Sequence, residues 1–145
     1  MRKLILAIST VALAVSAAYA DPIADRKAIM KERGGLVGGL AKMAEGKTPF
    51  DAAAVLTALQ GLQVNEDKLD IDALFTPGSD QGDTTASPKI WEDMAGFKAD
   101  NDRYKAALAA AVAAPAQNVA ALGAQVGALG KECGTCHETF RVKKN

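Results

Sequence analysis

The sequence predicts an all-α protein, folded as an up-down-up-down antiparallel four-helix bundle. Alanine, leucine and valine are abundant, aromatic residues make up only 5% of the 145-residue chain, and no stretch alternates apolar and polar residues as a strand would. Four segments instead repeat apolar residues three and four positions apart, which is the spacing of one helix face. Most connections between these segments are short, so consecutive helices are expected to pack antiparallel.

The first helix is expected over residues 22–45, because proline at position 22 suits a first turn, where its missing N–H costs nothing. Two seven-residue series mark its apolar side: Ile23, Met30, Val37 and Ala44, and Ile29, Leu36 and Met43. A glycine- and proline-containing turn over residues 46–49 ends it. The second helix follows Asp51, a suitable N-cap. Its apolar face is marked by three residues: Val55, Leu59 and Leu62.

Residues 70–88 are expected to form a long loop because they carry several proline and glycine turn signals. The third helix then begins near Pro88, and its seam contains one polar residue: Ile90, Met94, Phe97, Asn101, Tyr104, Leu108 and Ala111. Asn101 is expected to fix the register, to lie at a dimer interface, or to be the solvated edge of the helix. After Pro115 the last helix has a seam that ends in two cysteines: Val119, Leu122, Val126, Leu129, Cys133 and Cys136.

The last helix carries the run Cys133-Gly134-Thr135-Cys136-His137, the spacing at which a c-type haem is attached. On a helix the three side chains share one face, so two thiols can form thioethers while the adjacent imidazole reaches the iron. His137 is the only histidine, which excludes a haem with two histidine ligands from one chain. A zinc site built on the two cysteines would need two further Cys or His ligands, and the chain has only one histidine and no other cysteine. A redox-active dithiol or a disulfide is the remaining alternative, but the preceding residues show none of the strand pattern expected around such a dithiol.

The amino terminus predicts a cleaved signal peptide over residues 1–20. Arg2 and Lys3 precede a short apolar run, and Ala18-Tyr19-Ala20 fits a cleavage site. Residues 21–145 are therefore expected to form one mature domain in a bacterial periplasm. The chain has 17 basic and 17 acidic side chains, so no excess charge indicates nucleic acid or an anionic membrane. No nucleophile–base pair, paired carboxylates or phosphate loop is visible, and an enzyme is not expected.

Antiparallel packing predicts which residues share a level with His137. The end of the last helix lies beside the start of the first, so His137 is expected level with Arg26 and Met30. Met43 stands thirteen residues beyond Met30, roughly 20 Å away at 1.5 Å per residue, and is too far to reach the same iron. The third helix brings Trp91 and Met94 to the level of His137.

The chain resembles the class II c-type cytochromes, the group of cytochromes c′ and their low-spin relatives. The most specific feature is a CxxCH motif close to the carboxyl terminus, because class I cytochromes carry it near the amino terminus. Weaker matches occur in the right order along the mature chain, at residues 26–31, 46–51, 74–75, 82–83, 88–91, 97 and 130–141.

The resemblance implies one haem c, covalently held by Cys133 and Cys136, with His137 as the proximal iron ligand. It also implies that Met30 faces the open side of the iron. Met30 is expected to be the sixth ligand, as in the low-spin relatives; the alternatives are a non-coordinating distal wall, as in five-coordinate cytochromes c′, and an ordinary core position. Met94 is the competing sulfur.

The resemblance further places two arginines at the haem. Arg26 is expected at a haem propionate, with a solvated surface position as the alternative. Arg141 is expected beside the proximal imidazole, with a helix-terminal cation that meets the dipole as the alternative. Trp91 and Phe97 are expected in the pocket wall.

The function expected from these features is one-electron transfer in the periplasm, with redox partner proteins meeting an exposed haem edge. The alternative is a five-coordinate cytochrome c′ that binds NO or CO, and a weaker one is a thiol–disulfide enzyme. Family members form antiparallel dimers through their first two helices or remain monomers, so a homodimer is one expected assembly.

Overall fold

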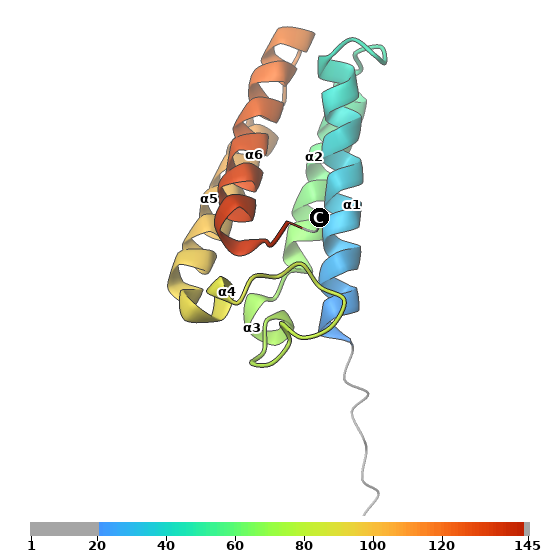
Figure 1. Ribbon diagram of the computed structural model, residues 1–145. Helices are drawn as coiled ribbons and strands as arrows, with labels where there is room; N and C mark the ends of the chain where they lie inside the picture. The colour runs from blue at the N-terminus through green and yellow to red at the C-terminus, as the bar shows by residue number, and fades with distance from the viewer. Residues whose placement is uncertain (1–20, 144–145) are drawn as a thin grey trace, which may run out of the picture.

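The structure is a computed structural model that describes residues 21–143. This part of the chain folds into six helices: α1 (Pro22–Ala44), α2 (Ala52–Asp67), α3 (Ile71–Leu74), α4 (Lys89–Glu92), α5 (Met94–Ala113) and α6 (Val119–Phe140). Figure 1 shows the four long helices side by side, with α3 and α4 at one end. The predicted signal peptide lies outside the described residues.

The four long helices form a closed ring of antiparallel neighbours. Helix α1 packs against α2 and α6, and α5 packs against the same two helices. The predicted four-helix bundle is therefore confirmed. No helix within residues 21–143 is long and apolar enough to cross a membrane.

Side-chain caps explain where the long helices begin. Asp51 accepts hydrogen bonds from the backbone N–H groups of Ala53 (2.8 Å) and Ala54 (3.1 Å), as predicted for an N-cap. Asp21 and Asn118 cap α1 and α6 in the same way. Helix α1 ends one residue earlier than expected, and the turn that follows contains Gly46 at φ +70°, a conformation that glycine adopts without a Cβ clash.

The predicted third helix is wrong at its start, because the chain is interrupted at Asp93. Helix α4 ends at Glu92, and Asp93 has non-helical backbone angles (φ −134°, ψ 63°). Its carboxylate accepts a hydrogen bond from Gly96 N at 2.9 Å and so caps a new helix, α5. Residues 70–88 are also not wholly a loop, since they contain α3.

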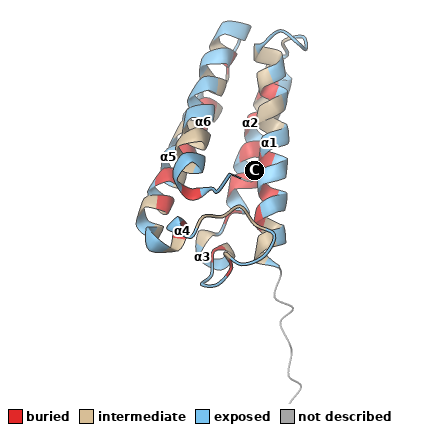
Figure 2. Ribbon diagram, in the orientation of Figure 1, coloured by how far each residue is buried: buried red, intermediate tan, exposed pale blue. Residues whose placement is uncertain are grey.

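The core consists of two clusters of buried side chains. The aliphatic cluster fills the half of the bundle near the turns after α1 and α5: Leu40, Val55, Leu59, Leu62, Tyr104, Leu108, Ala111, Ala116, Leu122 and Leu129. The aromatic cluster fills the other half, near α3 and α4: Ile29, Leu69, Phe75, Ile90, Phe97 and Phe140. Figure 2 shows the buried positions on the inner faces of the helices.

The buried side of α1 differs from the predicted apolar series. Its buried residues are Arg26, Ile29, Arg33 and Leu40, while Met30 is exposed. A seven-residue spacing does connect Arg26 to Arg33, but an apolar pattern cannot select arginines. Asn101 proves to be an inter-helix contact, since its Nδ2 donates to Glu66 Oε1 on α2 at 2.7 Å.

Candidate haem site

The two cysteines lie on the inner side of α6, where the two core clusters meet. Cys133 packs against the aliphatic cluster and Cys136 against the aromatic cluster. Both sulfurs are unpaired and half-buried. Burial, with smaller contributions from Asp100 and Cys133, raises the pKa of Cys136 to about 11. A reactive dithiol needs a lowered thiol pKa, so this environment argues against a thiol–disulfide enzyme.

His137 follows Cys136 on the last turn of α6 and is exposed. Partial burial lowers the pKa of the imidazole, and the positive charges of Arg141 and Arg33 lower it further. The neutral imidazole is the form that binds metal ions, so the surroundings favour the ligating state. Arg141 is therefore close enough to His137 to act on it electrostatically.

A pair of backbone hydrogen bonds holds the end of α6 against the loop before α4. Ser87 N donates to Phe140 O (3.0 Å), and Val142 N donates to Thr85 O (2.9 Å). Arg141 Nε adds a longer contact to Thr85 Oγ1 at 3.3 Å. This C-terminal bridge, between residues 85–87 and 140–142, fixes the chain just beyond His137 and crosses the front of the bundle in Figure 1.

The three described methionines differ in packing. Met43 packs against the aliphatic cluster at the far end of α1, where its sulfur accepts a hydrogen bond from Asp51 N at 3.3 Å. Met94 packs against the aromatic cluster. Met30 belongs to neither cluster, and its side chain is 37% exposed. The core position that we considered for Met30 is therefore wrong.

Arg26 is buried, so the solvated position considered for it is also wrong. Its Nη1 donates to Leu74 O and to Ser79 Oγ, both at 3.1 Å, and its Nη2 donates to Ser79 O at 2.6 Å. The guanidinium also lies 4.7 Å from the ring centroid of Phe75. Arg26 thus ties α1 to the loop after α3, and no hydrogen bond within residues 21–143 uses its Nε.

The cluster against which Cys136 packs contains several aromatic side chains. Phe97 makes edge-on contacts with Phe75 (centroids 4.8 Å apart) and Phe140 (5.2 Å). Trp91 packs against the same cluster, and its Nε1 donates to Phe75 O at 3.0 Å. Both residues expected in the pocket wall therefore belong to the cluster that contacts Cys136.

Sequence reasoning missed a buried polar group between α1 and α2. Arg33 on α1 binds Asn65 and Glu66 on α2, and its guanidinium lies 4.6 Å from the ring centroid of Tyr104. The Tyr104 hydroxyl is buried and has no hydrogen-bond partner among residues 21–143. The sequence did contain a signal for this group, namely a polar residue at a core position. Glu66 stands four residues after Leu62, so both lie on the buried side of α2.

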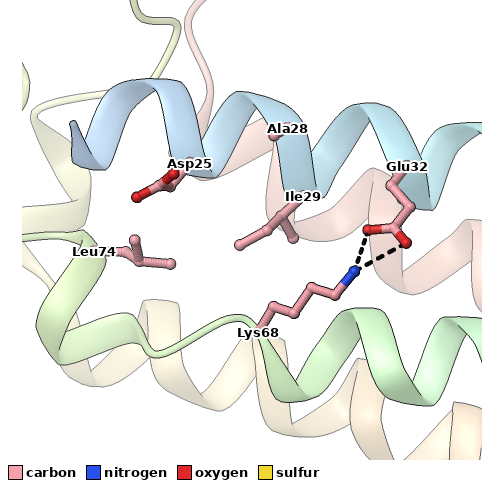
Figure 3. Close-up of a pocket in the computed structure, with 6 residues that line it drawn as sticks. All are labelled: Asp25, Ala28, Ile29, Glu32, Lys68 and Leu74. Atoms are coloured by element: carbon pink, nitrogen blue, oxygen red, sulfur yellow. Dashed lines mark hydrogen bonds and ion pairs between the residues drawn. The ribbon is translucent and has the colours of Figure 1, made fainter. Parts of the chain in front are cut away.

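A shallow pocket borders α1, and no residue of the CxxCH motif (residues 133–137) lines it. It is lined by Asp25, Ala28, Ile29, Glu32, Lys68 and Leu74. Figure 3 shows the Lys68 ammonium between the two carboxylate oxygens of Glu32, at 3.0 and 2.8 Å. This ion pair is the exposed end of the polar group around Arg33, because Asn65 Nδ2 also donates to Glu32 Oε2 at 2.9 Å.

The donor set fits a covalently attached haem. Two unpaired thiols one turn apart, followed by a neutral imidazole, are the groups needed for two thioethers and one axial ligand. The family model described as Cytochrome C' matches residues 21–141. This chain belongs to the cytochrome c′ family. Members of the family bind haem c covalently through two cysteines, and Cys133 and Cys136 are the two cysteines of this chain.

Relatives with two different names resemble this family member. Cytochrome c-556 from Agrobacterium fabrum is 34% identical over 133 residues, which cover 91% of this chain and 89% of that protein. Cytochrome c′ from Rhodopseudomonas palustris is 38% identical over 131 residues, which cover 88% of this chain and 86% of that protein.

Solved structures confirm the bundle. The structure of cytochrome c′ from R. palustris superposes with a TM-score of 0.78 at 38% identity, and the match covers 87% of this chain and 99% of that one. A nitric oxide complex of a variant of cytochrome c prime from Alcaligenes xylosoxidans superposes with a TM-score of 0.75 at 29% identity, covering 86% of this chain and 95% of that one.

Proposed function

We propose that this cytochrome c′ family member is an exported one-electron carrier in which His137 and Met30 would both bind the iron of haem c. The packing of the methionines carries the proposal. Met43 and Met94 pack into the core clusters, whereas Met30 stays outside both and partly exposed, on the helix that packs against α6. A methionine–histidine pair is a known ligand set of electron-transfer haems.

Haem c, when bound, supplies an iron that cycles between Fe(III) and Fe(II). The protein's part is to hold the ligands and to limit rearrangement. The C-terminal bridge supports this role because it ties the chain just beyond His137 to the loop at residues 85–87. Exposed residues on the last turn of α6, among them Glu138 and Thr139, leave this end accessible to a redox partner protein.

Arg26 and Arg141 complete the proposed site. Arg26 is fixed by Leu74 and Ser79, and its uncommitted Nε–H could serve a haem propionate. Arg141 would stand beside the proximal imidazole, where its positive charge already opposes protonation of His137. In this role both arginines act as fixed donors or charges.

A second function is supported by one relative. The nitric oxide complex named above shows that a protein of the same fold binds this gas. In that alternative, Met30 is a distal wall that does not coordinate, and NO or CO reaches a five-coordinate iron.

Absorption spectra separate the two functions. We expect the wild-type holoprotein to be low-spin, with sharp reduced bands and little response to CO. Met30→Leu should become high-spin and bind CO, whereas Met94→Leu, the matched control, should keep the wild-type spectrum. A wild-type protein with broad high-spin bands and a clear CO shift would contradict ligation by Met30 and favour the gas-binding function.

Export and assembly are tested on the same preparation. The full-length chain is expressed in a bacterium that matures c-type cytochromes. We expect periplasmic protein whose intact mass matches a chain that begins at Asp21 and carries one haem. Cytoplasmic protein of full-length mass would contradict export. Analytical ultracentrifugation of the holoprotein then tests whether it forms a homodimer.

A further inference from the structure

Directional hydrogen bonds join α1 to α2 in the interior of the bundle. Arg33 of α1 is only 7% exposed, and its Nη2 donates to Glu66 Oε2 at 2.6 Å. Its Nε donates to Asn65 Oδ1 at 2.9 Å. Asn65 Nδ2 donates in the other direction, to Ile29 O at 3.1 Å. Two adjacent residues of α2 therefore hold α1 at two points one helical turn apart.

The same bonds reach α5, the helix diagonal to α1 in the ring. Glu66 accepts on its second oxygen, Oε1, from Asn101 Nδ2 at 2.7 Å. Less than one turn further along α5, the ring centroid of Tyr104 lies 4.6 Å from the Arg33 guanidinium. Arg33, Asn65, Glu66 and Asn101 form one polar network. It joins three helices through atoms that must stay within hydrogen-bond distance.

Apolar packing alone places α1 only loosely along the bundle axis. Two of its four buried residues are Arg26 and Arg33, and only Ile29 and Leu40 bury apolar side chains. Further apolar residues on the second half of α1 pack only partly buried. The same half contains four glycines, at each of which an added Cβ would meet no atom of a neighbouring helix within 4 Å in the described part of the chain: Gly34, Gly35, Gly38 and Gly39.

Apolar positions on α1 also repeat every seven residues, so a shifted helix would present a similar apolar face. The polar network has no such tolerance. A shift of one turn moves Arg33 by about 5.4 Å, beyond hydrogen-bond reach of Asn65 and Glu66, and leaves buried charges unpaired. A shift of two turns would bring Arg26 to the network, but it would carry Arg33 into the aliphatic cluster at the place of Leu40. Only one register of α1 satisfies the network.

We propose that the polar network sets the register of α1 in the bundle, and that Arg33 is thereby the positioning residue for Met30. A polar group at a core position can select one register where apolar packing permits several. Met30 lies three residues before Arg33, about 4.5 Å along the helix axis at 1.5 Å per residue. Fixing Arg33 therefore fixes how far along the bundle Met30 stands. The part of the inference that concerns Met30 rests on the proposed function and deepens it.

A distance measurement on the holoprotein tests the register. Arg33→Met/Asn65→Leu/Glu66→Leu replaces the network by apolar side chains and leaves no buried charge unpaired, a change that buried ion pairs often tolerate. Spin labels are attached at two exposed positions, Lys42→Cys on α1 and Val64→Cys on α2. With the network intact, pulsed electron resonance of the reduced protein should give one narrow distance. The triple variant should give a second distance, displaced by up to about 5 Å, one helical turn.

The matched control removes packing from the same helix and keeps the network. Leu40→Ala deletes a side chain that is only 1% exposed, so it should lower stability and keep the single distance. The absorption spectrum adds a readout for Met30. Wild type and Leu40→Ala should be low-spin, whereas the triple variant should contain a high-spin fraction that binds CO. A network that only stabilised the bundle would give the reverse order, with the less stable protein showing the more disturbed spectrum.

A single distance of wild-type length in the triple variant would overturn the proposal. A second distance with an unchanged low-spin spectrum would overturn the positioning role of Arg33. If the triple variant does not fold, Asn65→Leu decides by the same distance, because it removes the bonds to Arg33 and Ile29 and keeps the ion pair. A second distance in that variant supports the proposal, and one unchanged distance overturns it. A high-spin wild-type protein would instead refute ligation by Met30, while the spin-label distances would still decide the register.

Discussion

The two halves of the bundle are stabilised by different kinds of contact. In the aliphatic half, Val55, Leu59 and Leu122 are completely enclosed by neighbouring side chains. The turn that closes it is held by Gln125, which accepts from Ala116 N at 3.1 Å and donates to Ala114 O at 2.6 Å. The aromatic half instead relies on ring contacts, a long loop and the buried Arg26, and it leaves Met30 exposed.

This comparison indicates where the cofactor contributes to stability. The aliphatic half contains most of the completely buried aliphatic side chains and only one haem-attachment residue, Cys133, so its stability should depend less on the haem. The aromatic half contains Cys136 and Ile29, and the proposed iron ligand Met30 follows Ile29 directly on α1. We therefore expect haem attachment to stabilise this half selectively.

The largest effect should come from replacing both cysteines. Cys133→Ser/Cys136→Ser removes both thioether sulfurs, and we expect complete loss of covalently bound haem by mass spectrometry. Hydrogen exchange should then accelerate mainly in the aromatic half. Thr135→Ala, a control within the motif, should keep its haem, because the Thr135 hydroxyl donates to the Lys131 carbonyl one turn earlier and is not an attachment group. Equal acceleration of hydrogen exchange in both halves would contradict selective stabilisation of the aromatic half by the haem.

A cavity in the aliphatic half should lower stability without changing the haem. Leu59→Ala removes a fully buried side chain, which costs about 2–5 kcal/mol of unfolding free energy. Chemical denaturation measures this loss, and the absorption spectrum should stay that of wild type. Val64→Ala, on the exposed side of the same helix, should change stability by less than about 0.5 kcal/mol. An altered spectrum in Leu59→Ala would show that the halves are coupled.

Arg26→Lys should weaken the aromatic half by a smaller amount. Lysine keeps the charge but cannot reproduce the three hydrogen bonds to Leu74 and Ser79, and a loss of about 1–3 kcal/mol is expected. Limited proteolysis should detect faster cleavage in the loop near Ser79. Lys27→Ala breaks an exposed ion pair with Asp83 and a longer hydrogen bond to the Asp83 carbonyl, and it should cost about 0–1 kcal/mol. Equal losses in the two variants would contradict the role of Arg26.

The smallest effect at neutral pH should come from Tyr104→Phe. The hydroxyl has no hydrogen-bond partner in the described part of the chain, so its removal should leave stability unchanged or raise it by about 1 kcal/mol. Burial raises the pKa of Tyr104 to about 12, above its ordinary value of 10. The neutral form is thus favoured in the folded state, and this contribution is present below pH 10 and lost as pH rises towards 12. Denaturation between pH 9 and 12 should show a steeper loss in wild type than in the variant.

Sequence reasoning succeeded where one residue determines its own surroundings. Asp51 was predicted as an N-cap because its neighbours start a helix, and the cysteines were placed on the core face by their spacing. Met43 was excluded by helix length alone. These predictions need only local geometry, and the structure confirms the cap and the cysteines' inner face.

Sequence reasoning failed where a side chain depends on a distant partner. Arg33 is buried because Asn65 and Glu66, more than thirty residues later, meet its guanidinium. The break at Asp93 was missed for a different reason: the apolar seam continues across it, and only the backbone reveals the cap. Ligation by Met30 stays a prediction, because it depends on the haem as well as on the chain.

The C-terminal bridge has a consequence for the cooperativity of local opening. Its hydrogen bonds alternate between the two segments, with donors at Ser87 and Val142, so neither segment can separate while the other stays fixed. The loop before α4 and the last turn of α6 therefore open as a single unit. Hydrogen exchange at the amides of Ser87 and Val142 should report the same opening free energy, and the helix turn that carries His137 should not fray without releasing the loop.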